Sequence, residues 1–265
     1  MKNGKVKLDI DGPVAVLTLN DPTALNAVST PMLEDIQAAL DALEATGSGV
    51  RCLILTGEGR GFCAGANLGG GISHEPGASN SDAGDVLERF YHPILKRLRD
   101  LPFPMITAVN GVAAGVGMSF ALMGDMILAA KSSYFLQAFR RIGLVPDGGS
   151  TYLLPRLVGL ARAKELSLMA DKLPAPTALE WGLINRVYED DALMGEARKL
   201  ATELANGPTV ALGLIRKLYW NSPLNTYDAQ LDLERQSQKV AGRTEDFGEG
   251  VKAFFEKRPA QFKGK

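Results

Sequence analysis

The stretch that most constrains the fold runs from Met105 to Met123, where the chain carries no Lys, Arg, Asp or Glu. Residues 105–109 form a short, partly β-branched apolar run that stops at Asn110-Gly111, a pattern typical of a buried strand ending in a turn. Residues 115–123 follow without a charge on any side, so a helix there would be buried all round. The sequence therefore predicts a strand, a turn and a helix in the interior of the protein.

Gly115 and Gly117, at the start of that helix, let another group approach the backbone closely. A helix that begins there directs unpaired N–H groups and the positive end of its dipole at whatever lies in front. Such a place can hold a developing negative charge on oxygen. Close packing of a helix on a strand explains the same glycines, so they do not establish a site by themselves. A dinucleotide fingerprint is excluded, because Phe120 stands where its third glycine belongs.

Asp147 is the one carboxylate near this stretch that invites a chemical role. Pro146 fixes the backbone before it, and Gly148 and Gly149 allow a tight turn after it, into residues 150–158. Asp is also a favoured helix N-cap. From the residues alone, a capping role and a catalytic role both remain open.

The remaining pattern predicts an α/β fold with a helical C-terminal portion, because strands and helices alternate first and helices dominate later. Asp11-Gly12-Pro13 predicts a hairpin between the first two strands, and Thr30 and Pro31 predict the start of the first helix. The glycine-rich segment 59–68 is expected to be a loop. Residues 69–84 are either a lid over a site or an ornamental surface loop. Strands are expected at 6–10, 14–19, 52–55, 105–109, 126–129, 134–136 and 184–188, and later helices at 85–101, 161–169, 176–181, 191–205, 209–220, 227–241 and 245–256.

Composition limits the class of protein. Apolar residues make up 46% and charged residues 22% of the chain, as in ordinary globular proteins. The formal net charge of −1 gives no reason to expect a nucleic-acid partner. The N-terminus lacks the apolar core of a signal peptide, and two cysteines are too few for a disulfide framework. We therefore expect a soluble, cytoplasmic protein with no membrane partner and no metal site.

Six motifs, in this order, resemble the crotonase superfamily of enoyl-CoA hydratases and isomerases. They are LNA at 25–27, GRGFCAGANL at 59–68, AVNGVAAGVG at 108–117, GLVPDGGSTYLLPRLVG at 143–159, ALEWGLI at 178–184 and EGVKAFFEKRPAQF at 249–262. The resemblance implies a spiral of repeated ββα units, here residues 1–200, and a helical trimerisation region, here residues 201–265. It also implies a homotrimer or homohexamer and an acyl-CoA substrate. Coenzyme A then arrives as part of the substrate, and no separate cofactor is expected.

The resemblance also implies site residues. The backbone N–H groups of Ala66 and Val116 would form an oxyanion hole for the thioester carbonyl. Coenzyme A would be bound by Ala24, Leu25 and Ala64, and by Phe262 and Lys265 of a neighbouring subunit. One departure is Asp21, which stands where the family usually has a basic residue.

The two glutamates of the hydratase pattern correspond here to Ser119 and Phe139. Asp147 matches the single acidic residue that several isomerases of the superfamily keep. One carboxylate can remove a proton γ to the thioester and return it at Cα, so an isomerase is expected. The members that isomerise ring-1,2-epoxyphenylacetyl-CoA to oxepin-CoA and shift enoyl-CoA double bonds are resembled most closely, at residues 88–91, 138–139, 146–147, 230–234 and 241–243. The alternatives are an enoyl-CoA hydratase that uses Asp147 alone and a non-catalytic acyl-CoA-binding scaffold.

Overall fold

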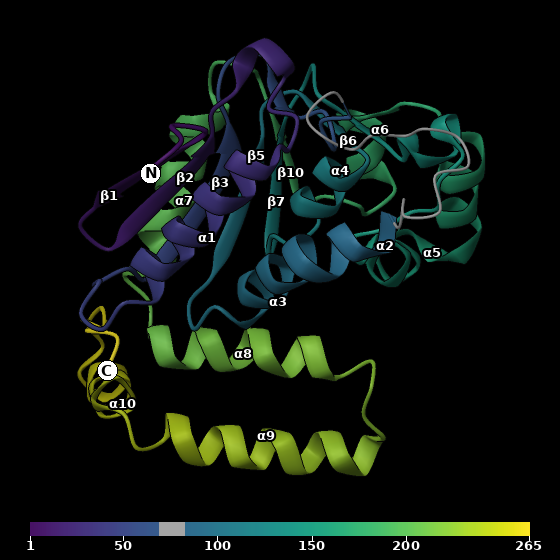
Figure 1. Ribbon diagram of the computed structural model, residues 1–265. Coiled ribbons are helices and arrows are strands. Elements are labelled where there is room, and N and C mark those ends of the chain that lie inside the picture. Colours follow the sequence, from purple (N-terminus) through teal and green to yellow (C-terminus); the bar gives the residue numbers. More distant parts are fainter. Residues whose placement is uncertain (69–82) are drawn as a thin grey trace.

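The computed structural model describes residues 1–68 and 83–265, which form two sheets surrounded by helices (Figure 1). The larger sheet has the order β1-β2-β3-β5-β7-β10 and is parallel from β2 onward, while β1 and β2 form the expected antiparallel hairpin. Its strands are β1 (Val6–Asp11), β2 (Val14–Leu19), β3 (Cys52–Gly57), β5 (Met105–Val109), β7 (Met126–Ala130) and β10 (Arg186–Tyr188). The smaller sheet has the order β4-β6-β8-β9. Its strands are β4 (Gly61–Cys63), β6 (Val112–Ala114), β8 (Tyr134–Leu136) and β9 (Leu173–Pro174).

The chain repeats one step three times: a strand in the larger sheet, a strand in the smaller sheet, then helix. β3 and β4 precede α2 (Ala83–Val86), and β5 and β6 precede α4 (Val116–Ala121). β7 and β8 precede η3 (Ala138–Ile142) and α5 (Ser150–Met169). Because each repeat adds a parallel strand to both sheets, the units wind as a spiral. The predicted fold of repeated ββα units is confirmed.

The inner strands β3 and β5 of the larger sheet are buried on both faces, as their continuous apolar sequences require. Leu53 and Leu55 of β3 lie in the main core, which includes α1 (Thr30–Glu44) and α3 (His92–Asp100). The alternate residues Cys52 and Ile54 lie in a second core under α7 (Leu193–Ala205). Successive side chains of a strand point to opposite faces, so α7 covers one face and α1 and α3 the other (Figure 1).

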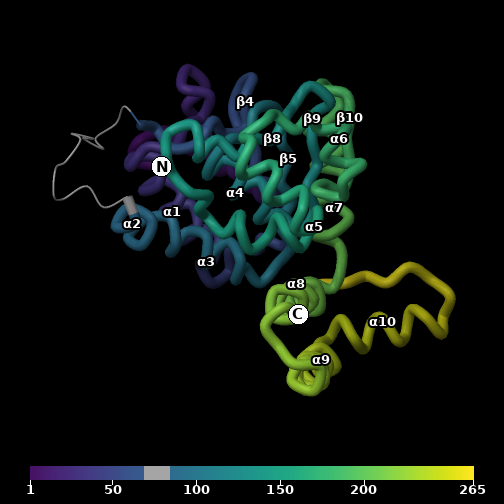
Figure 2. The backbone as a smooth tube through the Cα atoms, turned by 90° about the vertical axis from the view of Figure 1, so that its right-hand side faces the viewer, coloured from purple at the N-terminus to yellow at the C-terminus, as the bar shows by residue number. Residues whose placement is uncertain are grey.

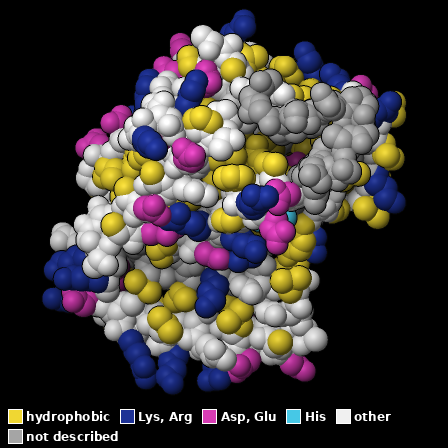
Figure 3. Space-filling model, in the orientation of Figure 1, with side chains coloured by type: hydrophobic (Ala, Val, Ile, Leu, Met, Phe, Trp, Pro, Cys, Tyr) yellow, Lys and Arg dark blue, Asp and Glu magenta, His cyan; other side chains and the backbone are white. Residues whose placement is uncertain are grey.

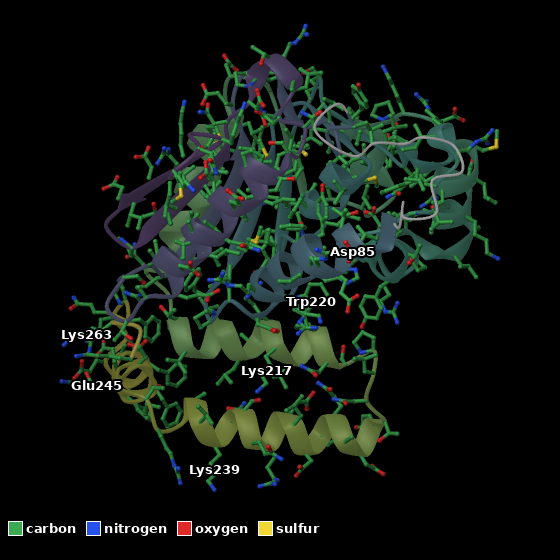
Figure 4. All side chains as sticks on the ribbon, in the orientation of Figure 1. Asp85, Lys217, Trp220, Lys239, Glu245 and Lys263 are labelled. Atoms are coloured by element: carbon green, nitrogen blue, oxygen red, sulfur yellow. The ribbon has the colours of Figure 1, made fainter. Side chains whose placement is uncertain are left out.

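The last three helices project from this body, as the turned view shows (Figure 2). They are α8 (Thr209–Asn221), α9 (Tyr227–Ala241) and α10 (Glu245–Glu256). The shorter helix α6 (Ala175–Glu180) comes earlier in the chain and is not one of them. Trp220 of α8 packs against the main core (Figure 4). Arg216, also on α8, is 5% exposed and donates hydrogen bonds to Asp125 and to the carbonyls of Leu98 and Leu101. One buried guanidinium therefore ties the projecting helices to the body.

Several predicted boundaries were wrong. The expected loop 59–68 contains β4, because Gly61 and Cys63 pair with residues of β6. The expected helix 85–101 is divided into α2, a π-helical turn η2 (Leu87–Tyr91) and α3. The expected helix 161–169 already begins at Ser150, with a kink at Gly159. The N-cap of α1 is Ser29 rather than Thr30, because the Ser29 hydroxyl accepts from the Met32 amide.

Two further expectations concern the strand at 184–188 and the segment 69–84. The strand expected at 184–188 begins only at Arg186. Most of the predicted lid or surface loop, residues 69–82, lies outside the described residues. Among the helices of residues 1–68 and 83–265, none has both the length and the apolar character needed to cross a membrane.

Candidate active site

Two backbone segments, 63–66 and 114–117, touch where glycines remove the side chains between them. A Cβ atom on Gly115 would lie 3.8 Å from the Cα atom of Gly65. A Cβ atom on Gly117 would lie 2.2 Å from the carbonyl oxygen of Cys63, closer than real atoms can approach. Gly115 also has φ 53° and ψ −129°, a conformation that suits glycine. Both glycines are therefore needed for α4 to start directly against the end of β4.

Each segment presents an amide without an acceptor at the position that the sequence predicts for an oxyanion donor. Val116 is the first residue of α4, where an N–H group has no intrahelical partner. Around Ala66, the Val28 amide donates to Gly65 and the Asn67 amide donates to Val28. Within residues 1–68 and 83–265, no carbonyl accepts from the Ala66 or Val116 amide. The two N–H groups named in the sequence analysis are thus close in space and available to an oxygen atom.

The turn that carries Asp147 packs against the same helix. A Cβ atom on Gly148 would lie 3.5 Å from Cγ2 of Val116 and 2.6 Å from Cβ of Ser119. Gly148 and Gly149 have φ values of 60° and 82°, so glycine is suited to both positions. The structure therefore brings Asp147 and Val116 into one site.

The carboxylate of Asp147 is nearly unsupported by hydrogen bonds. Its Oδ1 atom is buried and has no hydrogen-bond partner among the described residues. Burial raises the pKa of Asp147 to about 6, because desolvation disfavours the charged form. A carboxyl group in this state can both accept and return a proton near neutral pH. The alternative capping role is wrong, since Gly149 is the N-cap of α5 and no side chain caps that helix.

Ser119 and Phe139, at the two positions where the hydratase pattern has glutamates, lie at this site. Ser119 is fully buried, and its hydroxyl donates to the main-chain carbonyl of Asp147 at 2.9 Å. Phe139 is 6% exposed, and its Cζ atom lies 3.9 Å from the position of a Cβ on Gly115. Neither side chain can exchange a proton near neutral pH. The described part of the chain also contains no cluster of His, Cys, Asp and Glu that could hold a metal ion.

Tyr91 lies in the main core, as expected for an aromatic residue in an apolar helix, and its ring packs against Phe120, but the sequence did not reveal that it also lies near Asp147. It is 5% exposed and ends the π-helical turn η2. Burial, together with the charges of Cys63 and Asp147, raises the pKa of the phenol. Its hydroxyl therefore lies in the electrostatic environment of Asp147. π-Helical turns are frequent at functional sites, but their position cannot be read from residue spacing.

Ala24, Leu25 and Ala64, which are expected to bind coenzyme A, lie close together beside the Ala66 amide. The Ala64 amide donates to the carbonyl of Leu25 at 2.9 Å, and the Ala27 amide donates to Ala24. The buried Asn26 side chain donates to the carbonyls of Glu58 and Gly61, which fastens these loops together. The loop after β2 and the end of β4 thus form one continuous surface next to Ala66.

The other residues considered for coenzyme A are Asp21, Phe262 and Lys265. Asp21 is bound by Lys5 at 2.7 Å, and this hydrogen bond holds the pKa of the carboxyl below its usual range. Phe262 and Lys265 lie in the C-terminal tail against α10, where the Asp246 amide donates to the Lys265 carbonyl. Figure 1 shows that the C-terminus lies beside α10 and away from α4. The tail therefore does not reach the site of its own chain.

Comparison with known proteins agrees with this geometry. The family model described as enoyl-CoA hydratase/isomerase matches residues 9–265. The 1,2-epoxyphenylacetyl-CoA isomerase of Escherichia coli (strain K12) is 47% identical over 97% of this chain and 97% of its own. A protein of Rhodobacter capsulatus named probable enoyl-CoA hydratase is 41% identical over 98% of both chains. The crystal structure of enoyl-CoA hydratase from Bacillus anthracis superposes with a TM-score of 0.89 at 30% identity, covering 98% of this chain and 100% of that one.

These matches extend over nearly the whole chain, and the predicted resemblance is confirmed. The protein belongs to the enoyl-CoA hydratase/isomerase family, which has the crotonase fold.

Proposed function

We propose that the protein is a CoA-thioester isomerase in which Asp147 is the only acid and base. The observation that carries this proposal is a single buried carboxylate, without a hydrogen-bond partner for Oδ1 in the described chain, beside two unpaired amides. The thioester carbonyl would accept from Ala66 and Val116. Each such donor typically contributes roughly 3 kcal/mol of transition-state stabilisation.

The reaction needs only one proton carrier. From the 3-enoyl side, Asp147 takes a proton from Cα, and the electron pair delocalises onto the thioester oxygen at the two amides. The protonated Asp147 then returns the proton to Cγ, which leaves the double bond between Cα and Cβ. In the reverse direction the proton leaves Cγ and returns to Cα. No water is consumed and no second acid is required.

Hydration is the second candidate, supported by the name of the relative from Rhodobacter capsulatus. It needs a base to activate water and an acid to protonate Cα. Ser119 and Phe139 occupy the positions where the hydratase pattern has these groups, and Asp147 would have to perform both tasks. The isomerase is therefore the proposal that fits the side chains better.

The relative from Escherichia coli suggests the natural substrate. We extend to this chain the conversion of ring-1,2-epoxyphenylacetyl-CoA to oxepin-CoA, with enoyl-CoA isomerisation at the same site. The 47% identity over 97% of both chains supports this extension. The rings of Tyr91 and Phe139 near the carboxylate and the oxyanion amides also suit an acyl group that carries a ring.

Coenzyme A and the quaternary structure are parts of the same proposal. Ala24, Leu25 and Ala64 would contact the CoA moiety, and Phe262 and Lys265 would reach it from a neighbouring copy. Residues 1–200 would form the catalytic core, and residues 201–265 would assemble a homotrimer or homohexamer. Phe254 and Phe255 of α10 are 80% and 77% exposed, an unusual position for two adjacent aromatic rings. Figure 3 shows further hydrophobic side chains on the visible face of the lower helices.

One pair of assays tests the proposal. Purified protein is incubated with 3-enoyl-CoA and, separately, with crotonyl-CoA, and products are identified by mass and chromatography. We expect the 3-enoyl thioester to become its 2-enoyl isomer with no change in mass. Rapid gain of water by crotonyl-CoA would instead establish the hydratase. Tight binding of CoA thioesters without turnover of enoyl or epoxide substrates would indicate a scaffold.

A further inference from the structure

Asp147 is held through its main chain rather than through its carboxylate. Its carbonyl oxygen accepts from the Ser119 hydroxyl at 2.9 Å, from the Ser150 hydroxyl at 2.9 Å and from the Ser150 amide at 3.1 Å. Both serine side chains are completely buried. By contrast, Oδ1 of the same residue has no hydrogen-bond partner within the described ranges. The hydrogen bonds to Asp147 are thus divided unevenly: three donors bind its main-chain carbonyl, and none binds Oδ1 of its carboxylate.

This division resolves a conflict that any buried catalytic base faces. A hydrogen bond to the carboxylate would fix its position, but it would also stabilise the anion and make it a weaker base. Donors to the main-chain carbonyl fix the backbone of the turn without contacting the reacting oxygens. The flanking Gly148 and Gly149 would otherwise leave that turn with much conformational freedom.

Ser119 has a second property that Ser150 lacks, because it belongs to the helix that carries the oxyanion amide. Val116 and Ser119 both lie on α4, and Ser119 is packed directly against Gly148. The hydrogen bond from Ser119 therefore joins the element bearing the base to the element bearing one of the donors. A change in this bond would alter the distance between the base and the bound thioester.

We propose that Ser119 is a positioning residue for Asp147, assisted by Ser150, and that it fixes the carboxylate relative to the Val116 amide. This inference rests on the proposed role of Asp147 as acid and base. A serine thus has a task at a position where the hydratase pattern has a glutamate. Ser119 acts only through Asp147 and does not touch the substrate.

The test is the variant Ser119→Ala, with Ser133→Ala as the matched control. Ser133 is also buried, and its hydroxyl also donates to a carbonyl, that of Ala130, away from the site. We expect Ser119→Ala to lower kcat for 3-enoyl-CoA isomerisation roughly 10- to 100-fold, because small displacements of a reacting group are costly. KM should change less than about twofold, and the acid limb of the pH profile should keep its midpoint. Ser133→Ala should keep the wild-type kcat.

A double-mutant cycle with Asp147→Asn separates a positioning role from a structural one. If Ser119 acts through Asp147, adding Ser119→Ala to Asp147→Asn should leave the residual rate unchanged. A wild-type kcat in Ser119→Ala, or an equal loss with and without the carboxylate, would overturn the inference while the role of Asp147 stands. A wild-type kcat in Asp147→Asn would instead overturn the proposed function. If Ser119→Ala does not fold, Ser150→Ala must lower kcat and pass the same cycle, and a normal kcat there overturns the inference.

Discussion

Gly65 and Gly115 meet backbone to backbone, with 3.8 Å between the Cα atom of the first and the position that a Cβ on the second would take. Each glycine is followed directly by one of the two proposed oxyanion donors. The spacing between the Ala66 and Val116 N–H groups is therefore set by main-chain packing rather than by side chains. This explains why two residues of unremarkable character can form the central part of the site.

Replacement of Val116 by proline removes one oxyanion donor selectively. Proline is well tolerated at the first position of a helix, which Val116 occupies, so the fold should survive. We expect kcat to fall roughly 10²- to 10³-fold, the usual effect of losing one such donor. Glu245→Pro makes the same change at the first position of α10 and should keep the wild-type rate. Similar rates in the two variants would show that the Val116 amide has no part in the reaction.

The elevated pKa of Asp147 predicts an acid limb in the pH profile. Burial raises this pKa to about 6, and the proposed reaction starts from the ionised carboxylate. The value of kcat/KM for 3-enoyl-CoA should therefore rise with pH and level off above about 6, since it reports the free enzyme. The limb should be absent from the residual activity of Asp147→Asn. A midpoint near 4 would mean that the carboxylate is not desolvated.

The same pKa predicts a stability effect of opposite direction. The folded-state pKa of Asp147 lies above the unfolded value near 3.9. The stabilising contribution of Asp147 to the free energy of unfolding is therefore fully present below about pH 4. It is lost as pH rises through about 6, because the folded chain must then bury a charge. Asp147→Asn should therefore raise the unfolding free energy at pH 8 by about 1 kcal/mol, a figure reduced for partial exposure, and have little effect at pH 4. Urea unfolding at both pH values measures this, and equal effects would contradict it.

The buried Arg216 should be essential for attaching the C-terminal helices. Arg216→Met removes a guanidinium that serves Asp125 and the Leu98 and Leu101 carbonyls, and it leaves the carboxylate of Asp125 without that partner. Breaking such a pair costs about 3–5 kcal/mol in unfolding free energy. Arg235→Met is the matched control, because Arg235 pairs with Asp232 on the surface, where a pair contributes at most about 1 kcal/mol. Equal losses in urea unfolding would refute this account.

The exposed rings of α10 should be covered by another copy of the chain. We expect Phe254→Ser combined with Phe255→Ser to shift the purified protein from a trimer or hexamer toward the monomer. Light scattering coupled to size-exclusion chromatography measures the mass. Ile10→Ser, which replaces an exposed apolar side chain on β1, should leave the assembly intact. An unchanged mass in the double variant would place the interface elsewhere.

The sequence was most informative where one physical demand dominates. Every strand of the larger sheet was predicted, because continuous apolar runs such as 105–109 have few alternatives to a buried strand. The smaller sheet was only partly predicted. The strands β4, β6 and β9 were missed. They contain three, three and two residues, too few for a period to be visible, and they depend on pairing with other segments. The π-helical turn before α3 likewise leaves no mark in the spacing of apolar residues.

At the site, Asp147 was recognisable because it is a charged residue in an apolar and glycine-rich context. The residues that hold the backbone of Asp147 in place could not be recognised from the sequence. Ser119 and Ser150 are ordinary residues in sequence, and their hydrogen bonds to one carbonyl arise from the packing of α4 against the turn at Gly148. Tyr91 is a core residue, as expected, and its proximity to Asp147 follows only from the placement of its helix.

Transfer of a deuterium label tests the central claim most directly. The substrate is 3-enoyl-CoA deuterated at Cα, and the 2-enoyl product is examined by mass spectrometry and NMR at low conversion. If Asp147 alone carries the proton in a site shielded from water, part of the label must appear at Cγ, and Asp147→Asn must lose at least ~10²-fold in rate. A product without deuterium at Cγ, formed by Asp147→Asn as fast as by the wild type, would contradict the account.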